Sequence, residues 1–132
     1  MEIKLEDWTI HFVKNKDLIA RKLINYEEKE GFILFHFKDK DVKYYVKEHL
    51  DATILSLIKE DCFKTIVCLA DKKNLDFLID NWDLFKGIET LSLLFVRMSD
   101  NAKWIINPFV HSKICDDSAL KLGLTSMYDN TF

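Results

Sequence analysis

The distribution of apolar and polar residues along the chain predicts six strands and four helices. Segments 32–37 and 63–70 are apolar on both alternating faces, which is typical of central strands covered on both sides. The other predicted strands are residues 8–13, 42–46, 88–96 and 103–107. The first of these leaves an alternative open, because Leu5, Trp8 and Phe12 also lie at helical spacing.

Four segments have the periodicity of amphipathic helices, and they are residues 17–27, 52–60, 75–86 and 118–128. The clearest is 75–86, whose apolar residues fall on one stripe and whose aspartates fall on the other side. Asn74 is the expected N-cap of this helix, and Gly87 is expected to end it. Asp51 is the expected N-cap of the helix over 52–60.

Together these elements predict an α/β or α+β protein with a mixed sheet of about six strands. The chain has 132 residues, of which 48% are hydrophobic and 31% are charged, so residues 1–132 are expected to form a single soluble domain. The predicted order is βαββα followed by βαββα, which suggests an internal repeat of residues 8–61 and 64–128.

A shift of 56 residues tests this repeat. It places Thr9 and Ile10 on Thr65 and Ile66, and it gives five identities over positions 9–31. Average residue usage would give roughly one or two identities by chance. The alternative is that two βαββα units look alike without common descent, and the sequence leaves both interpretations open.

Charge and cysteine content limit the partners and the compartment. The net charge is −3, and only two of the 19 basic residues, Arg21 and Arg97, are arginine, which does not favour nucleic-acid binding. No uncharged run approaches the length of a membrane span, and the first residues do not resemble a secretory signal, so we expect no membrane association. Three cysteines without a close pair fit a reducing, cytoplasmic setting.

The common catalytic and cofactor motifs are absent. The three glycines are isolated, so no phosphate loop, dinucleotide fingerprint or nucleophile elbow can be written with them. The sequence also contains no HExxH, no CxxC and no EF-hand loop. We therefore predict no cofactor and no metal, and whether the chain is an enzyme stays open.

Polar residues follow two of the predicted strands. Asp71 and Asn74 come after segment 63–70, and Asp100 and Asn101 come after segment 88–96. If these strands are parallel, their carboxyl ends share one edge, where the four side chains form an acidic cleft for a cation or an amine. The alternative is that aspartate and asparagine serve here only as turn and cap residues.

Two histidines are candidates for chemistry. His111 and Cys115 are i,i+4 neighbours if 109–115 is helical, and an imidazole can activate a thiol. The adjacent Asp116 opposes this, because a carboxylate raises the pKa of a thiol. His36 lies within segment 32–37, either as a buried general base or as a core histidine bonded to backbone or a carboxylate.

These observations favour a small non-enzymatic interaction or regulatory module that self-associates, as a dimer, or docks a protein partner. The first alternative is a small enzyme or ligand-binding protein that uses the strand-end cleft or the His111–Cys115 segment. The second alternative is nucleic-acid processing with a divergent metal site.

Overall fold

The computed structural model describes residues 4–132, apart from the side chain of Asp117. The helices are α1 (Leu5–Lys16), α2 (Ile54–Leu57), α3 (Lys72–Asp80), α4 (Trp82–Phe85), α5 (Pro108–Ile114) and α6 (Leu120–Thr131), with a short 3-10 helix at Asp117–Ala119. The strands are β1 (Leu23–Lys29), β2 (Phe32–Phe37), β3 (Asp41–Val46), β4 (Phe63–Leu69), β5 (Leu91–Arg97) and β6 (Ala102–Ile106).

All six strands form one mixed sheet in the order β1-β2-β3-β4-β5-β6. The central strands β3, β4 and β5 are parallel, whereas β1, β2 and β6 run antiparallel to their neighbours. The predicted α/β class and the mixed six-stranded sheet are therefore confirmed. The strands β4 and β5, which Asp71 and Asp100 follow in the sequence, are parallel neighbours.

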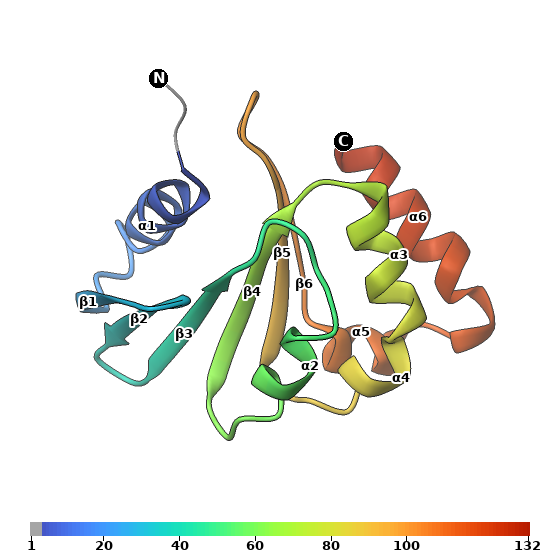
Figure 1. The fold of residues 1–132 in the computed structure, drawn as a ribbon, viewed down its shortest axis with the longest axis horizontal. Helices are drawn as coiled ribbons and strands as arrows, with labels where there is room; N and C mark the ends of the chain where they lie inside the picture. The colour runs from blue at the N-terminus through green and yellow to red at the C-terminus, as the bar shows by residue number, and fades with distance from the viewer. Residues whose placement is uncertain (1–3) are drawn as a thin grey trace.

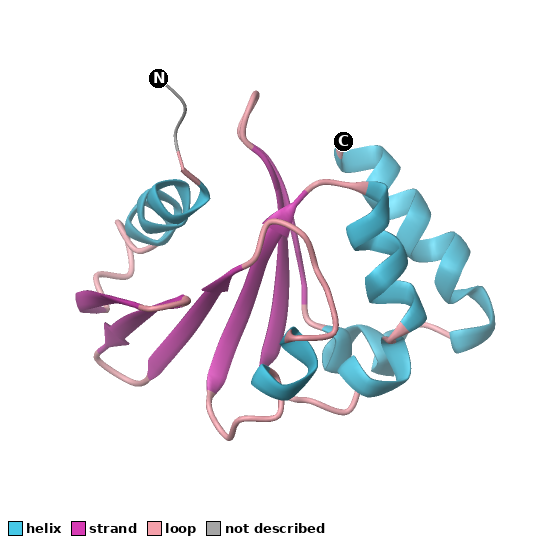
Figure 2. Ribbon diagram, in the orientation of Figure 1, coloured by secondary structure: helices cyan, strands magenta, loops and turns pink. Residues whose placement is uncertain are grey.

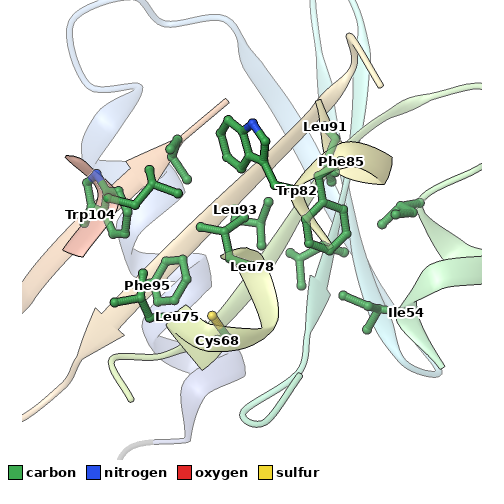
Figure 3. Packing of buried hydrophobic residues seen from close by; sticks show 14 of the residues in the cluster. Ile54, Cys68, Leu75, Leu78, Trp82, Phe85, Leu91, Leu93, Phe95 and Trp104 are labelled. Atoms are coloured by element: carbon green, nitrogen blue, oxygen red, sulfur yellow. The ribbon is translucent and has the colours of Figure 1, made fainter. Parts of the chain in front are cut away.

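The helices are divided unequally between the two faces of the sheet. Figure 1 shows α1 on one face and the remaining helices on the other, and Figure 2 distinguishes the helices from the strands of the sheet by colour. The larger core, between the sheet and α2 to α6, is built around side chains such as Leu93 and Phe95 of β5 and Trp82 of α4 (Figure 3). The smaller core packs Leu5 and Val13 of α1 against Phe35, Tyr44 and other residues of the sheet.

Two elements near the N-terminus differ from prediction. Residues 8–13 are helix and not strand, since they lie within α1, where Leu5, Trp8 and Val13 are buried against the sheet. Acidic residues in its first turn and lysines in its last turn favour the helix dipole. Tertiary burial thus outweighs the strand propensity of the β-branched residues.

The predicted helix over 17–27 is also wrong. Arg21 has a positive φ of 52°, and the Asp17 carboxylate accepts hydrogen bonds from the backbone N–H of Lys22 and of Leu23. These contacts close a turn, after which β1 pairs antiparallel with β2. The gain from pairing with a neighbouring strand outweighs the weak helical stripe of this segment.

Several boundaries in the second half also shift. The helix predicted over 75–86 is two helices that meet at Asn81, and its N-cap is Asp71, whose side chain accepts from Lys73 N–H. The helix predicted over 52–60 shortens to α2, and Pro108 begins α5, a helix not included among the four predicted.

The internal repeat is not confirmed. Residues 9–31 contain part of α1 followed by β1, whereas residues 65–87 contain most of β4 followed by α3 and α4. The identities between the two stretches therefore join residues in different secondary structures. Among the described residues, no helix has both the length and the apolar character that crossing a bilayer requires.

Candidate ligand pocket

A cavity of about 340 Å³ lies between the C-terminal end of α1 and the sheet. Because α1 is the single helix described on this face, part of the sheet beside it stays uncovered. The cavity is close to the amino ends of β4 and β5. Its lining consists of Val13, Lys16, Asp17, Ala20, Lys22, Phe37, Asp39, Lys40, Val42, Tyr44, Phe63, Lys64, Thr65, Thr90, Ser92 and Ile105.

Three hydroxyl-bearing residues form a row across the floor of this pocket. Tyr44 of β3 is the register partner of Thr65 of β4, and Thr65 is the register partner of Ser92 of β5. Tyr44 is itself part of the α1-side core, and Thr65 and Ser92 each lie two residues from a member of it, so all three side chains belong to the face that α1 covers in part. The row places three hydroxyl groups side by side on this face of the sheet.

The three hydroxyls of this row differ in whether they have a hydrogen-bond partner within the protein. Burial raises the pKa of the Tyr44 phenol, and a hydrogen bond from the Thr65 hydroxyl opposes that effect. Ser92 is half-buried, and its hydroxyl has no hydrogen-bond partner among the described residues. A bound molecule could therefore accept a hydrogen bond from Ser92 without displacing a protein group.

Lysines surround the opening of the pocket. Lys22 Nζ lies 3.5 Å from an oxygen of Asp39, whereas Lys16 and Lys40 have no carboxylate partner among the described residues. The ammonium of Lys40 lies instead 4.5 Å from the centre of the Phe63 ring. The pocket thus combines two unpaired cations with an unpaired hydroxyl, which is a favourable arrangement for an anionic group.

The fourth lysine of the lining, Lys64, is 1% exposed and supports the pocket from the other face of the sheet. Its Nζ donates to the Glu60 and Cys62 carbonyls at 2.5 and 3.0 Å, and to the Thr90 hydroxyl at 3.1 Å. These bonds tie together the two loops that lead into β4 and β5. Lys64 therefore holds the amino ends of these strands in place and is not free for a ligand.

The four residues predicted to form an acidic cleft at the carboxyl ends of β4 and β5 are each engaged within the protein. Asp71 caps α3. Asn74 is buried and bonded to the loop after β3 and to the end of β4, and Asn101 accepts a hydrogen bond from Trp8 Nε1 at 2.8 Å. Arg97 donates two hydrogen bonds to Asp100 and lowers the pKa of that carboxyl to about 2.

The described residues therefore hold no cluster of three carboxylate, imidazole or thiol groups that could bind a metal ion, at this edge or elsewhere. Of the four predicted residues, Asn101 lines a cavity, but a second one, beside the middle of α1. The other three do not line either of these two cavities.

The segment with His111 and Cys115 is helical, as the i,i+4 argument required. The His111 ring makes an edge contact with Trp82, with centroids 5.6 Å apart, and Cys115 is exposed after the last turn of α5. The Asp116 carboxylate accepts from Ser118 N–H at 3.1 Å and so serves the turn into the 3-10 helix. None of the three residues lines the pocket.

His36 has the carboxylate partners that the sequence did not identify. Its Nε2 lies 2.6 Å from Glu27 on β1, and its Nδ1 lies 2.9 Å from Asp41 on β3. Ionised carboxylates only accept, so this geometry favours the protonated form of the ring, in which both nitrogens donate. The ring is partly exposed, not buried, and it links three strands on the face opposite α1. This arrangement does not suit a general base.

We expect the His36 contacts to make stability depend on pH. Glu27 first, and then Asp41, raise the pKa of His36, while His36 lowers the pKa of Glu27. A raised histidine pKa stabilises the fold below about pH 6.5, and a lowered glutamate pKa stabilises it above about pH 4.3. The full contribution therefore lies between these values and declines as the pH rises through the pKa of the folded imidazole.

Urea unfolding of the protein and of His36→Gln between pH 5 and pH 9 measures this effect. The stability difference between the two proteins should shrink as the pH rises. His49→Gln is the matched control, since His49 is exposed and has no ion pair among the described residues. A difference that stays constant over this range would contradict the assignment.

The hydroxyl row was not among the sites predicted from the sequence. A signal was present, because Thr65 and Ser92 are single hydroxyl residues within strands that are otherwise almost entirely apolar. What the sequence did not show is that these residues lie in register beside Tyr44, next to the end of a helix.

Comparison with known proteins adds no identity. No protein-family model matches the chain, and no curated protein is significantly similar to it.

Proposed function

We propose that this protein is a small non-enzymatic regulatory module that binds a small anionic molecule in the pocket beside α1. The observation that carries the proposal is the unpaired Lys16 and Lys40 at the opening of a cavity whose floor includes the unpaired Ser92 hydroxyl. The volume of about 340 Å³ is at the lower end of the range of small-molecule sites, about 300–1,000 Å³.

The chemistry of the pocket supports binding more than catalysis. Its hydroxyls have no imidazole or carboxylate base bonded to them among the described residues, and a hydroxyl without a base is a weak nucleophile. Phosphate and carboxylate groups accept hydrogen bonds from ammonium and hydroxyl donors. The three free cysteines support our expectation of a reducing, cytoplasmic setting.

Calorimetric titration with inorganic pyrophosphate tests the proposal. We expect binding that weakens with added salt, because the attraction is partly electrostatic. Replacing Lys40 by glutamine should raise the Kd about fivefold, the effect of losing about 1 kcal/mol from one exposed ion pair. Ser92→Ala should raise the Kd by a similar factor through the lost hydrogen bond.

Lys121→Gln is the matched control, because Lys121 is an exposed lysine on α6, on the opposite face of the sheet. Equal loss of binding in Lys40→Gln and Lys121→Gln would show a general charge effect and would contradict a site beside α1.

A second candidate function, docking of a protein partner or a second copy, is favoured by one observation. In the turn between α1 and β1, Leu18 and Ile19 are 67% and 96% exposed. Adjacent apolar side chains at this exposure are typical of a contact surface.

Sedimentation equilibrium tests self-association. If the chain is a dimer, Ile19→Asp should shift it toward monomer, whereas the control Leu122→Asp on α6 should not. A monomer at all concentrations would contradict self-association.

A further inference from the structure

A second cavity, of about 470 Å³, lies along the side of α1. It is lined by Trp8, His11, Phe12, Asn15, Lys16, Asn101 and Lys103. Lys16 also lines the first pocket, so this side chain borders both cavities. A ligand larger than a bare anion could occupy both.

The second cavity contains a fixed aromatic surface. Trp8 and Phe12 are one helical turn apart, and their rings stack with centroids 5.2 Å apart and an angle of 10° between the planes. The Trp8 indole is held by its hydrogen bond to Asn101 at the turn between β5 and β6. Trp8 is buried whereas Phe12 is only partly buried, so the Phe12 ring is the part of the stack that a ligand can reach.

Cationic and polar groups surround this ring. The ammonium groups of Lys16 and Lys103 lie 5.9 and 6.0 Å from the centre of the Phe12 ring, and neither has a carboxylate partner among the described residues. Asn101 uses its Oδ1 for Trp8, which leaves its amide NH₂ as a donor toward the cavity. The site offers stacking, hydrogen bonding at a ring edge, and positive charge.

We propose that the ligand is a planar heteroaromatic ring joined to a phosphate group, as in a nucleoside phosphate. The ring stacks on Phe12 with its edge toward the Asn101 amide, and the phosphate lies between Lys16 and Lys40. The flexible lysine stems allow their ammonium groups to follow the phosphate while the ring occupies the face of Phe12. This inference rests on the proposed anion pocket and adds to it the chemical class of the ligand.

Titration with two probes that share a phosphate arm tests the ring site. Adenosine monophosphate carries the ring and ribose 5-phosphate does not, so we expect the former to bind about tenfold more tightly, a typical effect of stacking one base. Phe12→Leu keeps an apolar side chain of similar size against Trp8 but removes the aromatic face. It should abolish most of this tenfold difference and leave the Kd of ribose 5-phosphate unchanged.

Phe109→Leu is the matched control. Phe109 is also partly buried and has a lysine ammonium, that of Lys113, 4.5 Å from its ring centre, but it lies on α5 on the opposite face. This variant should keep the tenfold preference.

The outcomes separate the two proposals. Equal affinity for both probes would overturn the ring site and leave the anion pocket standing. A preference for the nucleotide that survives Phe12→Leu would also overturn the ring site. Binding of neither probe, together with no binding of pyrophosphate, would overturn both proposals.

Discussion

Replacement of Phe95 by alanine is expected to lower the free energy of unfolding by about 3–5 kcal/mol, the usual range for a large buried aromatic residue. Phe95 lies in β5, fully buried in the larger core. Its ring lies 5.2 Å from that of Trp104 on β6 and 6.3 Å from that of Tyr128 on α6, measured between centroids. The substitution therefore leaves a cavity where two strands and a helix meet.

Urea unfolding followed by circular dichroism measures this loss. The matched control is Phe63→Ala, because Phe63 belongs to the neighbouring strand β4 but is 44% exposed. We expect the control to lose less than half as much stability. Similar losses in the two variants would contradict the position of Phe95 at the centre of the core.

Asn74→Ala is expected to lower the free energy of unfolding by about 2–4 kcal/mol, because it removes three hydrogen bonds made by a buried side chain and leaves backbone groups of Leu50 and Leu69 without this partner. Asn74 is 2% exposed. Its Nδ2 donates to the carbonyls of Glu48 and Leu69 at 2.8 and 2.9 Å, and its Oδ1 accepts from Leu50 N–H at 2.8 Å. One side chain thus joins the loop after β3 to the end of β4.

Asn74→Asp separates the hydrogen bonds from the packing, because aspartate keeps the shape of asparagine but loses both amide donors. It should be destabilising as well, whereas Asn25→Ala, at an exposed position of β1, should cost little. Thermal unfolding of the three variants in parallel gives the comparison. A cost for Asn74→Ala no larger than that for Asn25→Ala would contradict the bridging role.

Three of the strands, β2, β4 and β5, could be predicted from the sequence because nearly every position in them is apolar. Phe32–Phe37, Phe63–Leu69 and Leu91–Arg97 each carry a nearly continuous apolar run, and such runs depend little on distant contacts. The segment with Trp8 and Val13 could not be predicted in the same way. Its β-branched and aromatic residues fit either period, and packing against the sheet decides in favour of the helix α1.

The candidate site could not be predicted from the sequence, for a related reason. Because ligands often bind at the carboxyl ends of parallel strands, the sequence pointed to Asp71 and Asp100. In the structure, the Asp71 carboxylate caps a helix and the Asp100 carboxylate forms an ion pair. The pocket lies toward the amino ends of the same strands. It depends on the register of Thr65 with Ser92 and on the position of α1, and the sequence pattern does not determine these long-range features.

Nuclear magnetic resonance can locate the proposed anion-binding site beside α1. Pyrophosphate would be titrated into protein labelled with ¹⁵N while the backbone amide signals are recorded. We expect saturable shifts concentrated at Lys16, Lys40, Thr65 and Ser92, and little change along α5 and α6. Saturable shifts confined to α5 and α6, or no saturable shift at any amide, would contradict the proposed site.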